Sequence, residues 1–162
     1  MSTAQQQDLG FDPEALREKY RIERDKRLRE DGNEQYIEVK GDFAHYVDDP
    51  YLDEKIAREP LTDEVDVCIV GGGFGGLLAG ARLTEAGITG IRMVEKGGDF
   101  GGTWYWNRYP GAACDIEAYV YLPLLEETGY MPKRKFTTGE EILWYSQEIA
   151  RRYGLYDDAL FQ

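Results

Sequence analysis

The sequence predicts an α/β fold: a Rossmann-like βαβ domain, as part of an incomplete doubly wound sheet, with a helical N-terminal extension. Three observations predict it. The β-branched run Val65–Val70 is typical of a parallel strand. It leads directly into Gly71, Gly73 and Gly76, which fit the pattern G-x-G-x-x-G. A second apolar run ends at Glu95, so strand, glycine turn, helix and strand follow in the order of a βαβ unit.

Composition limits the classes of function. The chain has 162 residues and a formal net charge of −12, which repels the phosphates of nucleic acids and of anionic membranes. No apolar run approaches the roughly 20 residues that span a membrane. The polar N-terminus lacks the apolar stretch of a secretory signal, and two cysteines are too few for a disulfide framework. We therefore expect a cytoplasmic protein with no nucleic-acid partner and no membrane span.

The N-terminal extension, residues 1–62, begins with a stretch up to about Leu9 that we expect to be disordered. Asp12 is the predicted N-cap of a helix whose first residue is Pro13 and which runs to about Glu30. A thin apolar stripe among many charges favours a surface helix that covers the core, another domain or a partner subunit. An oligomer contact through this helix is therefore one expectation.

The rest of the extension, from Gly32 to Pro60, is acidic and rich in aromatic residues, and we predict that it is extended and partly helical. His45, the only histidine, is expected to be a surface or packing residue rather than a ligand, and we predict no metal site. The partial Rossmann-like domain is predicted to occupy residues 63–162.

Within this domain, the run Val65–Val70 is predicted to be a buried parallel strand. A helix is expected over Leu77–Ala86, with Gly87 in the position of a C-terminal capping glycine, and Ile91–Glu95 is the expected second strand.

After the second strand, the segment Ile116–Leu125 is compatible with a strand or an irregular wall. Thr138 and Glu141 predict a capping box at the start of a helix that runs to about Tyr153. The last residues, 157–162, show no pattern that predicts a closing element.

Each fingerprint glycine has a physical role. Gly71 makes the tight turn, Gly73 lets a pyrophosphate approach the backbone, and Gly76 lets the helix pack on the strand. The free amides and the positive end of the helix dipole then hold the phosphates. Glu95 lies 19 positions after Gly76, where a carboxylate accepts hydrogen bonds from ribose hydroxyls and repels a 2′-phosphate. These residues predict a dinucleotide site but do not separate FAD from NAD.

A second motif, Gly101 to Asp115, is more specific. Its glycine pair precedes Trp104 and a Tyr-Pro-Gly turn. It resembles the N-terminal signature of Baeyer–Villiger monooxygenases, [A/G]-G-x-W-x-x-x-x-[F/Y]-P-[G/M]-x-x-x-D. The fixed positions are filled by Gly101, Gly102, Trp104, Tyr109, Pro110, Gly111 and Asp115. The resemblance covers residues from about Asp63 to the C-terminus. The long extension resembles, more weakly, that of the subgroup acting on large cyclic or steroid-like ketones.

The glycine pair is expected to let backbone amides reach a phosphate or the flavin edge. Trp104 and Trp106 offer flat surfaces beside an aromatic ring system, although Trp106 and Tyr109 are equally expected as core aromatics. The resemblance implies that Asp115, in a mostly apolar setting, lies near the flavin and the nicotinamide as a catalytic residue. Cys114 is expected to be a packing residue. The residues that we predict to bind the cofactor are Gly71, Gly73, Phe74, Gly75, Gly76, Glu95, Lys96, Gly102, Thr103, Trp104, Asp115 and Tyr121.

The resemblance implies an FAD-binding domain in a monooxygenase that uses NADPH and O2 to insert one oxygen atom next to a ketone carbonyl, giving an ester or lactone. A second glycine fingerprint for NADPH and the second signature of the family, F-x-G-x-x-x-H-x-x-x-[W/P], are not found in the chain. We therefore expect a truncated piece of such an enzyme that does not oxidise ketones by itself.

Three other classes of protein share parts of the pattern. An N- or S-oxidising flavin monooxygenase or another FAD oxidoreductase has the same glycine fingerprint. A non-catalytic nucleotide-binding or interaction fragment would use the N-terminal helix to dock on a partner. An NAD-dependent dehydrogenase has no need of Trp104 and the glycines before it, which argues against that class.

Overall fold

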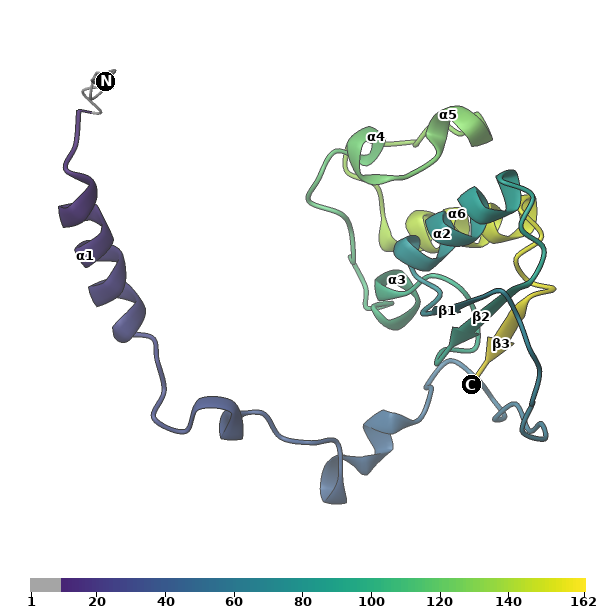
Figure 1. The fold of residues 1–162 in the computed structure, drawn as a ribbon, viewed down its shortest axis with the longest axis horizontal. Helices are drawn as coiled ribbons and strands as arrows, with labels where there is room; N and C mark the ends of the chain where they lie inside the picture. Colours follow the sequence, from purple (N-terminus) through teal and green to yellow (C-terminus); the bar gives the residue numbers. More distant parts are fainter. Residues whose placement is uncertain (1–9) are drawn as a thin grey trace, which may run out of the picture. The chain divides into compact units, whose positions relative to one another are not determined.

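The computed structural model describes residues 10–162 and divides into two compact units, Met1–Val47 and Asp48–Gln162 (Figure 1). The expected disorder up to Leu9 lies outside the described residues. Residues 48–62, which the sequence analysis assigns to the extension, contribute contacts to the second unit. The boundary between residues 62 and 63 stays a prediction.

The first unit contains the predicted surface helix, α1 (Pro13–Asp25). Its N-cap is Asp12, as predicted, because the carboxylate accepts hydrogen bonds from the amides of Glu14 and Ala15. The helix ends at Asp25, earlier than the predicted Glu30. None of its residues is buried, so the helix is stabilised by ion pairs on its own surface, such as Arg21–Asp25, and not by tertiary packing that would prolong it.

Short 3₁₀ helices occupy part of the acidic, aromatic stretch that follows. They are η1 (Gly32–Gln35) and η2 (Gly41–Val47), and neither has a buried residue. The expectation of an extended and partly helical segment is confirmed over these residues.

The second unit is built on a three-stranded parallel sheet in the order β1 (Val67–Val70), β2 (Ile91–Glu95) and β3 (Ala159–Phe161). The first two strands confirm the predicted βαβ unit. The third corrects the expectation that residues 157–162 have no closing element. A strand this short is stabilised by pairing with β2, which local sequence patterns do not reveal.

Two long helices pack together beside the sheet (Figure 1). α2 (Phe74–Glu85) connects β1 to β2, and α6 (Gly139–Arg152) precedes β3. α2 begins three residues before the predicted Leu77, because the fingerprint glycines form its first turn. The shared core consists mainly of Leu77, Ala81, Ile91, Met93, Phe100, Ile142, Tyr145, Ile149 and Leu155.

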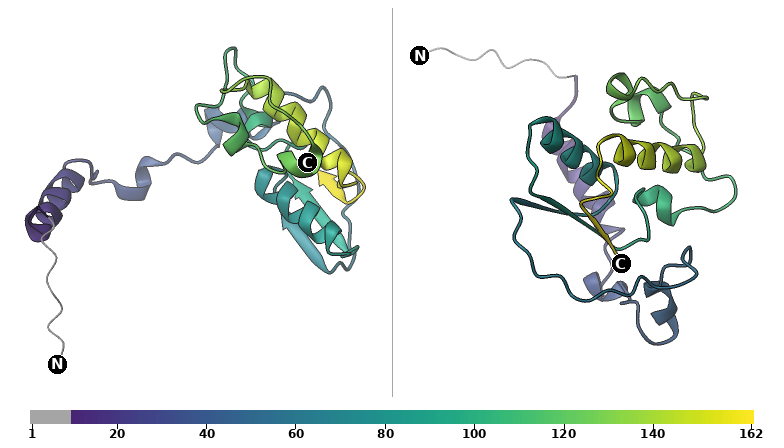
Figure 2. Two further views of the ribbon diagram at one scale, coloured as in Figure 1. Left: turned by 90° about the horizontal axis from the view of Figure 1, so that it is seen from above. Right: turned by 90° about the vertical axis from the view of Figure 1, so that its right-hand side faces the viewer.

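The opposite face of the sheet is open in the described part of the chain. Cys68, Val70 and Val94 all point outward, and Val70 is 84% exposed. The prediction of a buried strand is therefore wrong for the outer face of β1, because α2 and α6 cover only the other face (Figure 2). Within residues 10–162, no helix is both long enough and apolar enough to cross a membrane.

Short helices replace the strand or irregular wall considered for Ile116–Leu125. They are α4 (Ala118–Tyr121) and α5 (Leu125–Thr128), and α3 (Thr103–Trp106) precedes them. The glycine predicted to cap α2, Gly87, has a left-handed φ of +80°, as expected for that position.

The predicted capping box of α6 is half formed. The hydroxyl of Thr138 accepts a hydrogen bond from the amide of Glu141. The carboxylate of Glu141 does not reciprocate; it accepts from the amide of Lys133 and the hydroxyl of Tyr130.

Candidate functional site

The glycine turn lies between the end of β1 and the start of α2. Gly71 has a φ of +103°, a conformation that favours glycine, and its amide donates to the carbonyl of Val94 at 2.8 Å. A Cβ atom at Gly76 would lie 1.9 Å from the carbonyl oxygen of Gly71. The turn and the helix therefore approach each other at a distance that only glycine permits, as predicted for both positions.

The N-terminus of α2 is suited to an anion. Its N-cap residue, Gly73, has no side chain to cap the first amides, which have no acceptor within the helix. These amides and the positive end of the helix dipole meet at the glycine turn. The residues present therefore fit the diphosphate of a dinucleotide.

Glu95 lies beside this turn, at the carboxyl end of β2. It is 7% exposed, and its carboxylate accepts hydrogen bonds from the amides of Gly72 and Gly97, the latter at 2.6 Å. A carboxylate offers about four lone-pair positions, so ribose hydroxyls can still donate to it. The structure thus brings the predicted phosphate-binding and ribose-binding groups together at one edge of the sheet.

The second glycine motif packs against the first. The amide of Gly101 donates to the carbonyl of Gly72 at 3.0 Å. A Cβ atom at Gly102, where φ is +53°, would lie 2.7 Å from the Cα of Gly73. The amide of Gly101 is therefore used inside the protein, and the expectation that the glycine pair lets backbone amides reach the cofactor stays a prediction. Close packing of two backbones explains Gly102, while a Cβ atom at Gly101, where φ is +141°, would collide with the side chain of Leu143.

Three predicted aromatic residues gather near this contact. The indole nitrogen of Trp104 donates to the hydroxyl of Tyr121 at 2.9 Å, and the Tyr121 ring also contacts Phe74 edge-on, with centroids 5.6 Å apart. Trp104 is half-buried against Gly139, where a Cβ atom would lie 2.9 Å from the indole ring. These contacts fix the indole next to the glycine turn.

Four other predicted site residues are exposed. They are Gly75, Lys96, Thr103 and Asp115. Asp115 is exposed, whereas a mostly apolar setting was expected for it. Its proposed catalytic role stays a prediction.

Core packing was considered for Trp106 and Tyr109 and expected for Cys114. Tyr109 is 64% exposed, so it is not a core residue, and Trp106 is half-buried. Cys114 is buried in the core, which confirms the expected packing role. Cys68 is exposed.

Sequence reasoning missed Asp49. Its carboxylate is buried and accepts hydrogen bonds from the hydroxyl of Tyr105 at 2.6 Å and from the amides of Tyr51 and Gly98, both at 2.9 Å. Burial by itself raises the pKa of Asp49, but these hydrogen bonds outweigh it and hold the pKa below its usual value. No sequence pattern indicates the contacts with Gly98 and Tyr105, because these residues lie 49 and 56 positions after Asp49 in the chain.

The Asp49–Tyr105 contact predicts a pH dependence of stability. Burial raises the pKa of Tyr105 to about 12, and the hydrogen bond to Asp49 adds to the rise. Between pH 10 and 12 the unfolded chain loses this proton while the folded chain keeps it. The contribution of Tyr105 to stability is therefore complete below pH 10 and is lost as the pH rises toward 12.

Urea unfolding over this pH range is expected to show a steeper loss of unfolding free energy in the wild type than in Tyr105→Phe, which has no phenol proton to lose. Equal slopes in the two proteins would contradict the assignment.

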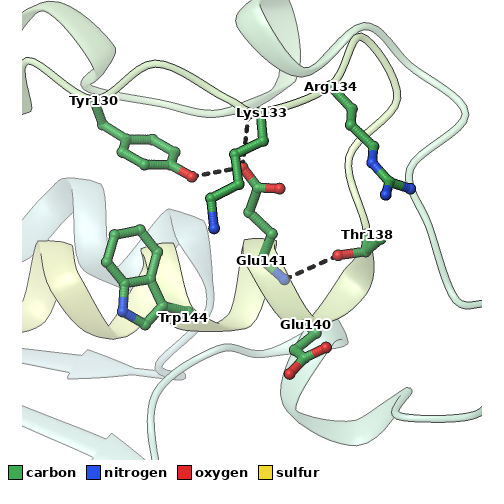
Figure 3. A pocket seen from close by; sticks show the side chains of 7 residues that line it. All are labelled: Tyr130, Lys133, Arg134, Thr138, Glu140, Glu141 and Trp144. Carbon is green, nitrogen blue, oxygen red and sulfur yellow. Dashed lines mark hydrogen bonds between the residues drawn. The ribbon is translucent and has the colours of Figure 1, made fainter.

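Two cavities of the described chain are not lined by the glycine turn itself. One, of about 700 Å³, lies between Trp104, the Tyr109–Ala113 turn and the start of α6. Another, of about 520 Å³, is lined by Tyr130, Lys133, Arg134, Thr138, Glu140, Glu141 and Trp144 (Figure 3). Lys133 and Arg134 are exposed. Among residues 10–162 no group of three or more His, Cys, Asp or Glu side chains is arranged to hold a metal ion.

Comparison with known proteins finds a family model that matches the glycine region and relatives that match most of the chain. The family described as "NAD(P)-binding Rossmann-like domain" matches residues 69–130. A Baeyer–Villiger monooxygenase from Streptomyces coelicolor is 58% identical over 152 residues, which are 92% of this chain and 25% of that protein. The chain thus spans about a quarter of the length of the curated relatives it matches.

Solved structures agree with the sequence relatives. The polycyclic ketone monooxygenase of the fungus Thermothelomyces thermophila matches with a TM-score of 0.75 and 44% identity, over 91% of this chain and 25% of that one. An oxidised steroid monooxygenase bound to NADP matches with a TM-score of 0.53 and 42% identity, over 60% of this chain and 19% of that one.

Proposed function

Because this chain is the counterpart of the N-terminal quarter of the Baeyer–Villiger monooxygenase family, we propose that it supplies the groups that bind the ADP half of FAD. The observation that carries the proposal is the meeting of the uncapped α2 N-terminus with the Glu95 carboxylate at one edge of the sheet. The amides from Gly73 to Gly76 hold the diphosphate, and Glu95 accepts hydrogen bonds from the ribose hydroxyls.

We further propose that the protein acts as an FAD- and NADPH-dependent monooxygenase. FAD, when bound, supplies the redox and oxygen chemistry that inserts one oxygen atom beside a ketone carbonyl. The chain's own residues bind and orient it: the helix end fixes the diphosphate, while Trp104, held by Tyr121, provides a flat surface beside the ring system. Asp115 lies on the same motif and is proposed to act near the reacting atoms. The 162 residues alone are not expected to oxidise a ketone.

A bulky polycyclic ketone is the substrate class that we propose. Residues 63–162 are 100 of the 162 residues, so a match over 91% of the chain must include part of the extension. That match is to a protein named for polycyclic ketones, whereas the steroid monooxygenase matches over only 60%. Likeness in the extension therefore supports the polycyclic class.

Two further proposals complete the assignment. The free thiols of Cys68 and Cys114 suit the cytoplasmic location that we propose. An oligomer contact through α1 stays a prediction; it rests on the exposed apolar residues of that helix, such as Tyr20 at 69% exposure.

Titration of the 162-residue chain with FAD, followed by flavin fluorescence, tests the proposal. We expect reversible, saturable binding with one FAD per chain, competed by ADP, and no ketone-dependent oxidation of NADPH. Failure to saturate at FAD concentrations up to about 1 mM, which corresponds to about −4 kcal/mol, would contradict the proposed cofactor site.

A further inference from the structure

We infer that Asp49 is a positioning residue for the flavin site, because its hydrogen bonds hold residues 48–52 of the extension against the loop of residues 96–102, which keeps Glu95 and Trp104 in place. We call this contact the clasp. The inference rests on the proposed function, since it names a residue outside both glycine motifs that the same site requires. Segment 48–52 and the loop belong to the same compact unit, Asp48–Gln162.

The clasp is formed by three donors on one buried carboxylate. Oδ2 of Asp49 accepts from the hydroxyl of Tyr105 and from the amide of Gly98, while Oδ1 accepts from the amide of Tyr51. The amide of Gly98 also lies 3.0 Å from the Tyr105 hydroxyl. Hydrogen bonds to an ionised acceptor are stronger than neutral ones, so this carboxylate fixes the loop from one point.

Packing reinforces the hydrogen bonds. A Cβ atom at Gly98 would lie 2.5 Å from the side chain of Leu52, so the extension lies directly on the loop backbone. The guanidinium of Arg108 stacks over the rings of Tyr51 and Tyr105, at 4.0 and 4.4 Å from their centroids. The hydroxyl of Tyr51 donates to the carbonyl of Trp106 at 3.1 Å.

The clasp reaches both halves of the flavin site. On one side, Gly98 follows Gly97, whose amide donates to the Glu95 carboxylate at 2.6 Å. On the other side, Tyr105 follows Trp104 within α3. Release of Asp49 is therefore expected to loosen the loop backbone next to the amide of Gly97, which donates to Glu95, and the helix that carries the indole.

The matched substitutions are Asp49→Asn, which places an amide against these donors, and Tyr105→Phe, which keeps the ring and removes one donor. Asp48→Asn is the control, because Asp48 is an exposed neighbour whose carboxylate pairs only with Lys55 among the described residues. In the 162-residue chain, Asp49→Asn and Tyr105→Phe are each expected to weaken FAD binding by about tenfold.

The double variant is expected to bind FAD no more weakly than Asp49→Asn does, because the two residues act as one unit. At saturating FAD, the visible absorption band of the bound flavin is expected to shift in Asp49→Asn and to be unchanged in Asp48→Asn. Amide hydrogen exchange is expected to accelerate at residues 97–106 in Asp49→Asn while α6 keeps its protection.

Wild-type FAD affinity in both Asp49→Asn and Tyr105→Phe would overturn the clasp and leave the proposed function standing. Additive losses in the double variant would also overturn it, since the residues would then act separately. A wild-type chain that binds no FAD would overturn the proposed function itself, and the inference with it. If Asp49→Asn does not fold, Tyr105→Phe decides the question by its affinity and by the same exchange measurement.

Discussion

Gly76→Ala is expected to reduce FAD affinity by at least about 100-fold, which corresponds to about 2.7 kcal/mol. The new Cβ atom would lie 1.9 Å from the carbonyl oxygen of Gly71, and both atoms are held by backbone rather than by flexible side chains. Either α2 moves away from β1 or the turn opens, and each movement displaces the amides that face the diphosphate. Overpacking of this kind is also expected to lower the unfolding free energy by about 1–3 kcal/mol.

Gly75→Ala is the stability control for this prediction. Gly75 lies one position away in the same turn of α2, but a Cβ atom there meets nothing within 4 Å. The unfolding free energy of the Gly75→Ala protein is expected to equal or slightly exceed that of the wild type, because alanine has a higher helix propensity than glycine. Flavin fluorescence titration and urea unfolding measure the two effects. A Gly76→Ala protein with wild-type affinity would show that the close approach of turn and helix is not needed for binding.

Glu95→Gln is expected to weaken FAD binding almost as much as Glu95→Ala does, although glutamine has nearly the same shape as glutamate. Both carboxylate oxygens accept backbone amides, from Gly72 and Gly97. A glutamine has a single carbonyl oxygen, so its NH2 group would oppose one of these amides and leave a buried donor unsatisfied, at a cost of about 1–3 kcal/mol. We expect FAD affinity to fall by about 30-fold or more.

Selectivity gives a second readout for Glu95. The wild type is expected to bind ADP-ribose more tightly than 2′-phospho-ADP-ribose, because the carboxylate repels the 2′-phosphate. Glu95→Gln is expected to lose most of that preference. Glu126→Gln, an exposed charge removal on α5, serves as the control for a general electrostatic effect. An unchanged preference in Glu95→Gln would place the ribose elsewhere.

The parts of the site that the sequence predicted share one property: their physical cause lies in neighbouring residues. A β-branched run, glycines at fixed intervals and an acid at the end of the next strand specify β1, α2 and β2 almost alone. The Thr138 cap of α6 was predictable for the same reason, because its acceptor and donor are three positions apart.

The parts that were missed depend on contacts between distant segments. β3 exists because it pairs with β2, and Asp49 acts on Gly98 and Tyr105 from a segment that has no motif of its own. The exposure of Asp115 and of the outer face of β1 also had no local signal, since both depend on what packs over them rather than on their own sequence.

The most direct test of the central claim is amide NMR of the 162-residue chain titrated with ADP-ribose, which carries the diphosphate and ribose of FAD. We expect the largest shifts at the amides from Gly72 to Gly76 and at Gly97, beside the Glu95 carboxylate. Shifts that cluster instead around Lys133, Arg134 and the start of α6, with the glycine turn unaffected, would contradict the account.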